Sequence, residues 1–273
     1  MDILHALLLV GIGLTVGFIG TLIGAGGGFI LVPILLILYP KLGPEIITSI
    51  SLAIVFLNAC SGSIAYAKMK RIDYKSALAF SLATLPGAIL GAYLVNDIPE
   101  KFFDILLGLI LVSIAVFLLI KPGFTKKPGN NNKHRTSRSI TDNHGNRYEY
   151  SFKNSIGIIS SFFVGFLSSL LGIGGGIIHV PVLTSLLNFP IHVATATSHF
   201  VLTVMALAGT VTHIIQGNLD GQWFKVLYLG AGVVAGAQAG AAFSHHAKPR
   251  WIIQALAFAL LLVGIRMLLR SYN

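Results

Sequence analysis

The sequence contains few charged residues: Lys, Arg, Asp and Glu together make up 10% of its 273 residues, whereas 55% are hydrophobic. A soluble domain carries roughly a quarter charged residues, so this chain has too little polar surface to fold in water. Apolar runs recur along the whole chain, and about 20 such residues cross a bilayer core as a helix. The composition therefore predicts an all-α polytopic membrane protein whose surroundings are membrane lipid.

Cysteine is almost absent, because Cys60 is the only one in the chain. A single cysteine excludes an intrachain disulfide, a cysteine-based metal site and an iron–sulfur cluster. The sequence also lacks HExxH-type spacing, a phosphate loop and a complete dinucleotide fingerprint. We therefore expect no metal site and no cofactor.

Acidic residues are scarce as well, and all nine lie in connections or near the ends of apolar segments. They are Asp2, Glu45, Asp73, Asp97, Glu100, Asp104, Asp142, Glu149 and Asp220. Cation pumps and many proton relays place a carboxylate at membrane depth, so a cation substrate is disfavoured. No nucleophile–base pair is apparent either, which argues against an enzyme. A small anion bound by neutral donors fits this composition better.

Ten apolar segments are predicted as helices, five on each side of a polar linker. They run approximately Ile3 to Ile23, Phe29 to Leu38, Ile46 to Ala67, Ser76 to Val95, Phe102 to Ile120, Ile156 to Leu171, Ile177 to Leu187, Val193 to Ile215, Trp223 to Phe243 and Trp251 to Leu269. The second segment of each group is roughly 16 Å long as a helix, too short to span alone. We predict membrane repeat one over 1–121, a basic linker over 122–153 and membrane repeat two over 154–273.

The two groups share sequence. GFIGTLIGAGGGFILVP begins at Gly17 and GFLSSLLGIGGGIIHVP begins at Gly165, a shift of 148 (165 − 17). At a shift of 147, four further residues match: Thr48, Ser51, Gly62 and Asp73 fall opposite Thr195, Ser198, Gly209 and Asp220. The two groups are therefore interpreted as structural repeats.

The linker from Lys121 to Lys153 is strongly basic, which places it in the cytoplasm by the positive-inside rule. Its first part, Lys126 to Ser139, is polar and expected to be mobile, whereas Ile140 to Phe152 has the pattern of a small hairpin. The net charge of +10 lies in such connections and at segment ends, where lipid headgroups account for it. We expect no nucleic-acid partner.

Charge asymmetry also predicts that the repeats are inverted. Lys68 to Lys75 is basic and reads as cytoplasmic, while its counterpart Gln216 to Gln222 reads as external. Asn96 to Lys101 reads as external and its counterpart His245 to Arg250 as cytoplasmic. Equivalent connections on opposite sides define an inverted-topology repeat. One observation opposes this scheme: it places the C-terminus outside, yet Arg266 and Arg270 lie near that end of the chain.

Two glycine clusters should break the helices, because each helical glycine costs about 1 kcal/mol. They are Gly24, Gly26, Gly27 and Gly28, and Gly172, Gly174, Gly175 and Gly176. Exposed backbone at membrane depth requires a polar cavity, which predicts an anion site beside short broken helices. Close helix packing is the alternative, and it is the preferred interpretation for other small-residue pairs: Gly13 and Gly17, Gly20 and Gly24, and Gly232, Gly236 and Gly240.

Neutral donors follow each cluster: Thr48, Ser49, Ser51, Asn58, Ser61 and Ser63, and Thr195, Thr197, Ser198, His199, Thr203 and Thr210. Many such hydroxyls bond back to their own helix. The candidate substrate-binding residues are Gly26, Gly27, Gly28, Thr48, Ser51, Gly174, Gly175, Gly176, Thr195 and Ser198. His199 and His179 are candidates for proton coupling, with a structural role as the alternative, and His213 also falls at membrane depth.

These residues resemble a known family. The paired glycine segments ending in Val-Pro, the ATATSH stretch from Ala194 to His199, the glycine-rich fourth segments and the two-half plan are similar to the sulfite exporter TauE/SafE family of membrane permeases. The resemblance covers nearly the whole chain. It implies secondary transport, often export, of sulfite, an organosulfonate or a related sulfur oxyanion.

We accordingly expect a secondary transporter in the cytoplasmic (inner) membrane that uses alternating access and binds a small anionic substrate. A passive anion channel and a membrane-embedded factor of sulfur metabolism are the alternatives. A second copy of the chain, giving a homodimer, is a further candidate partner. The sequence identifies neither the anion nor the direction of transport.

Overall fold

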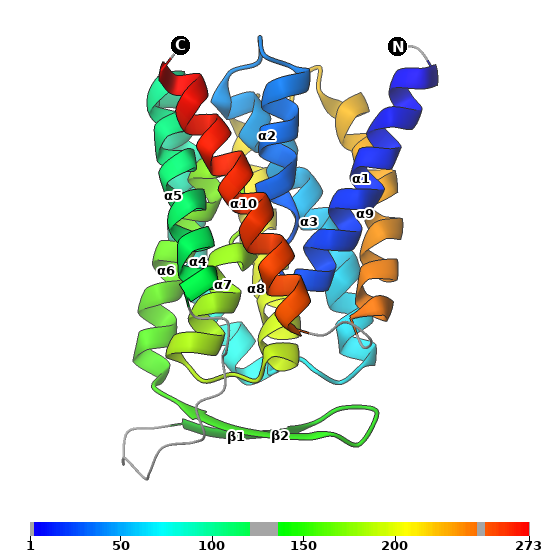
Figure 1. Cartoon of the computed structure of the whole chain (residues 1–273), viewed down its shortest axis with the longest axis vertical. Helices are drawn as coiled ribbons and strands as arrows, with labels where there is room; N and C mark the ends of the chain where they lie inside the picture. The colour runs from blue at the N-terminus through cyan, green and yellow to red at the C-terminus, as the bar shows by residue number, and fades with distance from the viewer. Residues whose placement is uncertain (1–2, 121–135, 245–248, 273) are drawn as a thin grey trace.

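The computed structural model describes residues 3–120, 136–244 and 249–272, which are mostly helical (Figure 1). The helices are α1 (Ile3–Ile23), α2 (Gly28–Leu38), α3 (Pro44–Lys68), α4 (Tyr74–Leu94), η1 (Val95–Asp97), α5 (Glu100–Ile120), α6 (Asn154–Leu171), α7 (Gly176–Pro181), the π-helical turn η2 (Val182–Leu186), α8 (Ile191–Ile215), α9 (Trp223–Phe243) and α10 (Pro249–Tyr272). Six helices of this described part are long and apolar enough to cross a membrane.

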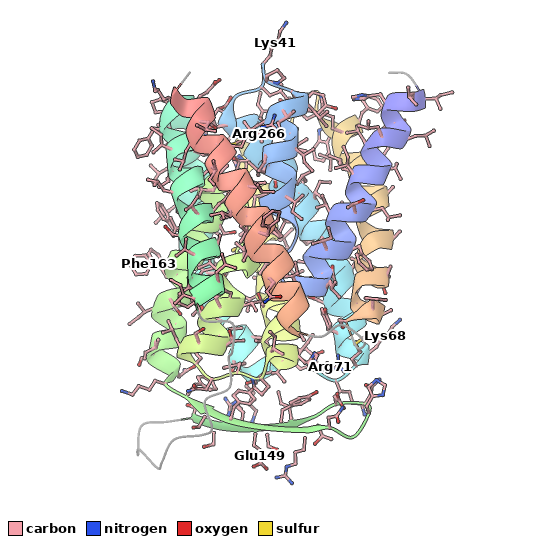
Figure 2. All side chains as sticks on the ribbon, viewed as in Figure 1. Lys41, Lys68, Arg71, Glu149, Phe163 and Arg266 are labelled. Atoms are coloured by element: carbon pink, nitrogen blue, oxygen red, sulfur yellow. The ribbon has the colours of Figure 1, made fainter. Side chains whose placement is uncertain are left out.

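Large apolar side chains cover the flanks of the bundle. Phe163, on the outer face of α6 in Figure 2, is 57% exposed, and Phe224 on α9 is 69% exposed. Labelled charged residues lie instead at the two ends, with Lys41 and Arg266 at one end and Lys68 at the other (Figure 2). An apolar belt between charged ends is the surface that a bilayer requires.

Long helices pair across the linker rather than within one part of the chain. α1 packs on α9, α4 on α6, α5 on α10 and α3 on α8. Figure 1 shows α2 in the half of the bundle away from the hairpin and α7 in the half next to it. Among the six candidate membrane spans, α3 is the most enclosed, with 78% of its apolar stretch buried against its neighbours.

Glycine allows the closest of these pairings. A Cβ on Gly13 would contact the Leu229 carbonyl, and one on Gly17 would lie 2.8 Å from Val233 Cα. Cβ atoms on Gly232, Gly236 and Gly240 would likewise meet backbone carbonyls of α1. The packing interpretation of these five glycines is confirmed.

The packing interpretation holds for Gly20 but is wrong for Gly24. A Cβ on Gly20, inside α1, would lie 2.6 Å from Gly27 Cα and 2.9 Å from Asn58 Nδ2 on α3. Gly24 lies beyond the end of α1 with φ of +85°, so it belongs to the chain reversal between α1 and α2, where the backbone requires glycine. Small-residue spacing alone could not separate these two cases.

A β-hairpin covers the end of the bundle where α3 ends and α4 begins (Figure 1). Strands β1 (Thr136–Thr141) and β2 (Arg147–Phe152) pair antiparallel, with Ile140 opposite Tyr148. The hairpin is therefore longer than the predicted Ile140 to Phe152. The part of the Lys126 to Ser139 prediction that falls on 136–139 is wrong, since these residues pair with β2, and residues 126–135 lie outside the described residues.

Buried ion pairs hold this hairpin on the helices. Arg71 Nη2 lies 3.3 Å from Asp142 Oδ2, with both side chains almost fully buried. Tyr150 donates its hydroxyl hydrogen to Asp73 Oδ2 over 2.8 Å, and Arg138 Nε lies 3.6 Å from the same oxygen. The hairpin is thus anchored on the connection between α3 and α4.

Aromatic contacts extend the anchoring to the second half of the chain. The rings of Tyr150 and Phe152 lie 4.4 Å and 4.9 Å from the ring of Phe189, which precedes α8. Asp73 also donates its backbone N–H to Thr197 Oγ1 over 3.1 Å. One small sheet therefore contacts both halves at the same end of the molecule.

Candidate functional site

The chain reverses direction inside the bundle at two glycine-rich breaks (Figure 1). Break one, residues 24–27, separates α1 from α2, and break two, residues 172–175, separates α6 from α7. Five glycines there have φ values between +65° and +85°: Gly24, Gly26, Gly27, Gly172 and Gly174. Other residue types rarely adopt such φ values, so the backbone itself requires glycine at these positions.

The two breaks lie against each other although 148 residues separate them along the chain. A Cβ added to Gly28 would lie 2.5 Å from the Gly172 carbonyl oxygen. A Cβ added to Gly176 would contact the Gly24 carbonyl oxygen and lie 2.7 Å from Ala25 Cα. The first residue of each short helix thus has no room for a side chain, because the other break occupies that space.

Two of the predicted serines form hydrogen bonds between the two halves of the chain in matching ways. Ser51 Oγ donates to the Gly172 carbonyl oxygen over 2.6 Å, and Ser198 Oγ donates to the Gly24 carbonyl oxygen over 3.3 Å. Each hydroxyl therefore satisfies a carbonyl at the break of the other half. In this arrangement both serines hold the backbone in place.

The two predicted threonines lie beside the same breaks. A Cβ on Gly172 would lie 3.3 Å from Thr48 Cβ, and one on Gly24 would lie 2.7 Å from Thr195 Cγ2. Thr48 is fully buried and its hydroxyl has no hydrogen-bond partner among the described residues. The structure thus brings the predicted glycines and hydroxyls together in one enclosed region.

Backbone N–H groups at both breaks are left free for a ligand. The amides of Ile30 and Leu31 donate to the Gly27 carbonyl, as expected of a first helical turn. The amides of Gly27 and Gly28 find no acceptor within the described residues, and the same holds for Gly175 and Gly176. Free amides at the start of a helix attract an anion by hydrogen bonding and by the helix dipole.

The candidate proton-coupling histidines lie apart from these amides and in different surroundings. His179 Nε2 lies 3.4 Å from Ser161 Oγ, and its ring meets that of Phe80 edge-on at 6.0 Å. His199 packs edge-on against Tyr66 at 5.4 Å, and its Nε2 has no partner among the described residues. Both are almost fully buried.

One polar cluster beside break one was not predicted from the sequence. Thr21 Oγ1 donates to Asn58 Oδ1 over 2.7 Å, and Tyr66 donates its hydroxyl hydrogen to the Thr21 carbonyl over 2.9 Å. Asn58 is among the predicted neutral donors, but the sequence did not predict it as a substrate-binding residue. The available signal was an Asn in the middle of an apolar helix, where an amide side chain is costly without a purpose.

Among the residues that the structure describes, no metal-ligand cluster is found near the breaks. Within the described ranges, no three His, Cys, Asp or Glu residues gather as metal ligands. Of the three buried carboxylates among the described residues, Asp73 and Asp142 contact the hairpin and Asp104 lies near the start of α5. Neutral donors therefore dominate the central region.

Comparison with known proteins identifies the family. The family model described as "Sulfite exporter TauE/SafE" matches residues 9–267 of the chain. The chain belongs to this family. The family consists of membrane transporters rather than enzymes, so the chain is a multi-pass membrane transporter, as its sequence predicts.

Several curated family relatives cover most of the chain. "Probable membrane transporter protein YunE" of Bacillus subtilis is 34% identical over 96% of both chains. "Probable membrane transporter protein MJ0441" of Methanocaldococcus jannaschii is 27% identical over 81% of this chain and 77% of its own. "Probable membrane transporter protein YdhB" of Bacillus subtilis is 24% identical over 90% and 91%. No solved structure matches the chain.

Proposed function

We propose that this transporter moves a small sulfur oxyanion, such as sulfite or an organosulfonate, across the cytoplasmic membrane by secondary transport. The observation that carries the proposal is the contact between the two breaks, where both halves contribute backbone amides that have no acceptor among the described residues. Such donors stabilise negative charge without a buried Lys or Arg. The family description, which names sulfite, supplies the substrate class.

Reciprocal contacts support an inverted repeat. Ser51 bonds break two while its counterpart Ser198 bonds break one, and α1 on α9 is matched by α6 on α4. Repeats related in this way, with broken helices at the midplane, let one site be exposed first to one side and then to the other. Alternating access is the mechanism that we infer.

Burial of the site supports an occluded state. The candidate residues Gly26, Gly27, Thr48, Ser51 and Ser198 are buried. An anion therefore reaches the amides only after the halves move apart. Thr48 and Thr195 lie where such a movement would expose their hydroxyls to the anion, which completes the donor shell that we propose.

Proton movement is the proposed energy source. A neutral imidazole that takes up a proton offsets the charge of an anion, and His199 lies on the same buried helix as Thr195 and Ser198. His179 lies on α7, three residues after Gly176. We assign the main coupling role to His199, because its Nε2 lacks a partner among the described residues.

Uptake into proteoliposomes tests the function. Purified protein is reconstituted and flux of sulfite, sulfate, thiosulfate, sulfoacetate and taurine is compared, with and without a pH gradient. We expect saturable flux and counterflow of sulfite or a sulfonate, increased by the gradient. Non-saturable flux without counterflow would indicate an anion channel, and no flux of any of the five would refute the sulfur-anion proposal.

A further inference from the structure

Two nitrogen donors meet beside Gly20, next to break one. A Cβ added to Gly20 would lie 2.5 Å from the Gly27 nitrogen and 2.9 Å from Asn58 Nδ2. Because Gly20 has no side chain, the Asn58 amide reaches the backbone of the break. We call the Gly27 amide and Asn58 Nδ2 the donor pair.

Neither member of the donor pair has an acceptor. The Gly27 amide makes no hydrogen bond with the described residues, and α2 continues from it for 11 residues. Asn58 is fully buried, and its Nδ2 likewise has no partner within the described part of the chain. Buried N–H groups are almost always paired, so two unpaired ones at the same place indicate a missing acceptor.

Thr21 is paired with the oxygen end of the Asn58 side chain. The Thr21 hydroxyl donates to Asn58 Oδ1 over 2.7 Å, which occupies the acceptor end of the amide. Tyr66 in turn donates its hydroxyl hydrogen to the Thr21 carbonyl over 2.9 Å and so ties α3 to the end of α1. The hydrogen-bearing nitrogen of Asn58 is left next to Gly27.

Break two carries a different side-chain donor. At the offsets that relate the repeats, Ser168 stands in place of Gly20 and Met205 in place of Asn58. Ser168 Oγ lies 3.2 Å from the position of a Cβ on Gly175 and has no partner among the described residues, so the donor beside break two is a hydroxyl on the first helix of that half and not an amide on α8. Met205 carries no N–H donor. The two breaks are therefore chemically different although their backbones correspond.

We propose that Asn58 binds the transported anion and that the site is asymmetric, with one anion oxygen held by the donor pair at break one. This inference rests on the proposed function. Both nitrogens lie within 3 Å of the same Cβ position and are therefore less than 6 Å apart, so one oxygen between them can accept from both. They favour an acceptor-only group such as the oxygen of a sulfite or a sulfonate, and they disfavour a neutral amine.

Equilibrium binding to the purified full chain tests the inference, with sulfite and methanesulfonate as the probes in calorimetry. Asn58→Leu keeps the branched shape and removes both N–H donors, so the Kd should rise about tenfold or more, as expected for a lost hydrogen bond to a charged group. Thr21→Val frees the Asn58 amide to rotate and should weaken binding by a smaller factor. Met205→Leu is the matched control and should leave the Kd unchanged.

The outcomes separate this inference from the proposed function. If the unaltered protein binds neither probe, the proposed function fails and the inference with it. If it binds but Asn58→Leu binds equally well, with an unchanged Tm in the absence of anion, the donor pair is wrong while the proposed function stands. Should Asn58→Leu not fold, an unchanged affinity in Thr21→Val overturns the inference. Equal losses in Met205→Leu and Asn58→Leu would overturn the asymmetry.

Discussion

At the residue scale, adjacent glycines in the same motif have different roles. Gly176 faces the backbone of break one, whereas a Cβ on Gly175 would meet only side chains, 2.8 Å from Val164 Cγ1 and 3.2 Å from Ser168 Oγ. Gly175 also has an ordinary helical φ of −56°. Backbone cannot move aside as a side chain can, so the two positions should respond differently to the same substitution.

Gly176→Ala should therefore destabilise the protein by about 1 to 3 kcal/mol, the usual cost of overpacking a close contact. Gly175→Ala should cost clearly less, because Val164 and Ser168 can adjust. Thermal unfolding of both variants in detergent measures the difference. Equal Tm values for the two variants would contradict the contact between the breaks.

Serines at two positions provide a second matched comparison. Ser51→Ala leaves the buried Gly172 carbonyl without its donor and should cost about 1 to 3 kcal/mol. Ser160 bonds the Ile156 and Gly157 carbonyls of its own helix and is partly exposed, so Ser160→Ala should leave Tm nearly unchanged. Denaturation of the two variants side by side checks this, and a stable Ser51→Ala would mean that the bond across the breaks adds nothing.

The sequence predicted which residues lie at the breaks where the repeat gave them a counterpart, and less so elsewhere. Thr48, Ser51, Thr195 and Ser198 were found because each has a counterpart at a fixed shift. Asn58 has Met205 opposite it, so no repeat marks it, and its link to Thr21 spans 37 residues. Contacts between distant helices leave no periodic trace in a chain that is apolar throughout.

At the element scale, the hairpin depends on a buried carboxylate with several polar partners. Asp142 accepts hydrogen bonds from the Asn146 and His144 amides and pairs with Arg71. Burial alone would raise the pKa of Asp142, but these hydrogen bonds and the Arg71 charge outweigh it and lower the pKa from 3.8 to about 2. Burial and the nearby Asp73 carboxylate raise the pKa of the Tyr150 hydroxyl, which stays protonated and donates.

The lowered pKa of Asp142 predicts how the docking of the hairpin on the helices responds to acid. Because the folded pKa lies below the ordinary value, the stabilisation is fully present above about pH 4 and is lost as pH falls toward 2. Hydrogen exchange of the β1 and β2 amides should therefore stay slow from pH 7 to 4, after correction for intrinsic rates, and lose protection below that.

Asp142→Asn is the control for that experiment. It removes the charge that Arg71 requires, so the strands should be less protected at pH 7 and should show a weaker dependence on acid. Glu149→Gln, which affects only an exposed pair with Arg147, should behave like the unaltered protein. Unchanged protection in Asp142→Asn at pH 7 would contradict the anchoring role.

Element boundaries were mostly predictable, since apolar segments end where polar residues begin. The π-helical turn Val182–Leu186 was not, because it results from Pro181 and from Thr184 Oγ1 donating to the Val180 carbonyl. Strand β1 was only partly found, because its first residues, Thr136 to Ser139, are polar and gain their order by pairing with β2.

At the scale of the whole molecule, the positive residues near the hairpin and the pairing of helices across the linker both fit an inverted repeat. The hairpin lies at the end that holds Lys68 and Arg71, and both chain ends lie at the other (Figures 1 and 2). The positive-inside rule predicts that the hairpin end faces the cytoplasm. Arg266 lies at the opposite end, so the positive residues near the C-terminus remain an exception to the rule.

Cysteine labelling tests this orientation. In a Cys60→Ser background, Lys70→Cys and Asp220→Cys place single thiols at exposed equivalent connections. We expect a membrane-impermeant maleimide added to intact cells to label position 220 and to reach position 70 only after lysis. Labelling of both from the same side would refute the inverted repeat.

Charge gives a prediction for the topology, whereas the exchange of partners between halves was not predictable from the sequence. Nothing in the composition of α1 indicates that it packs on α9 rather than on its neighbours in sequence. The choice depends on how glycine-lined surfaces such as Gly13 and Gly17 fit a partner backbone, which is a property of shape.

That exchange of partners has a consequence for biogenesis. While the ribosome is still making the linker, α1 has no α9 and α4 has no α6 to cover its glycine-lined face. The first half must therefore wait in the membrane as loosely associated helices, and the native contacts close only when the second half is inserted. Separately expressed halves should each be degraded alone yet assemble when made together, so that quality control in the cell acts on the pair and not on either half.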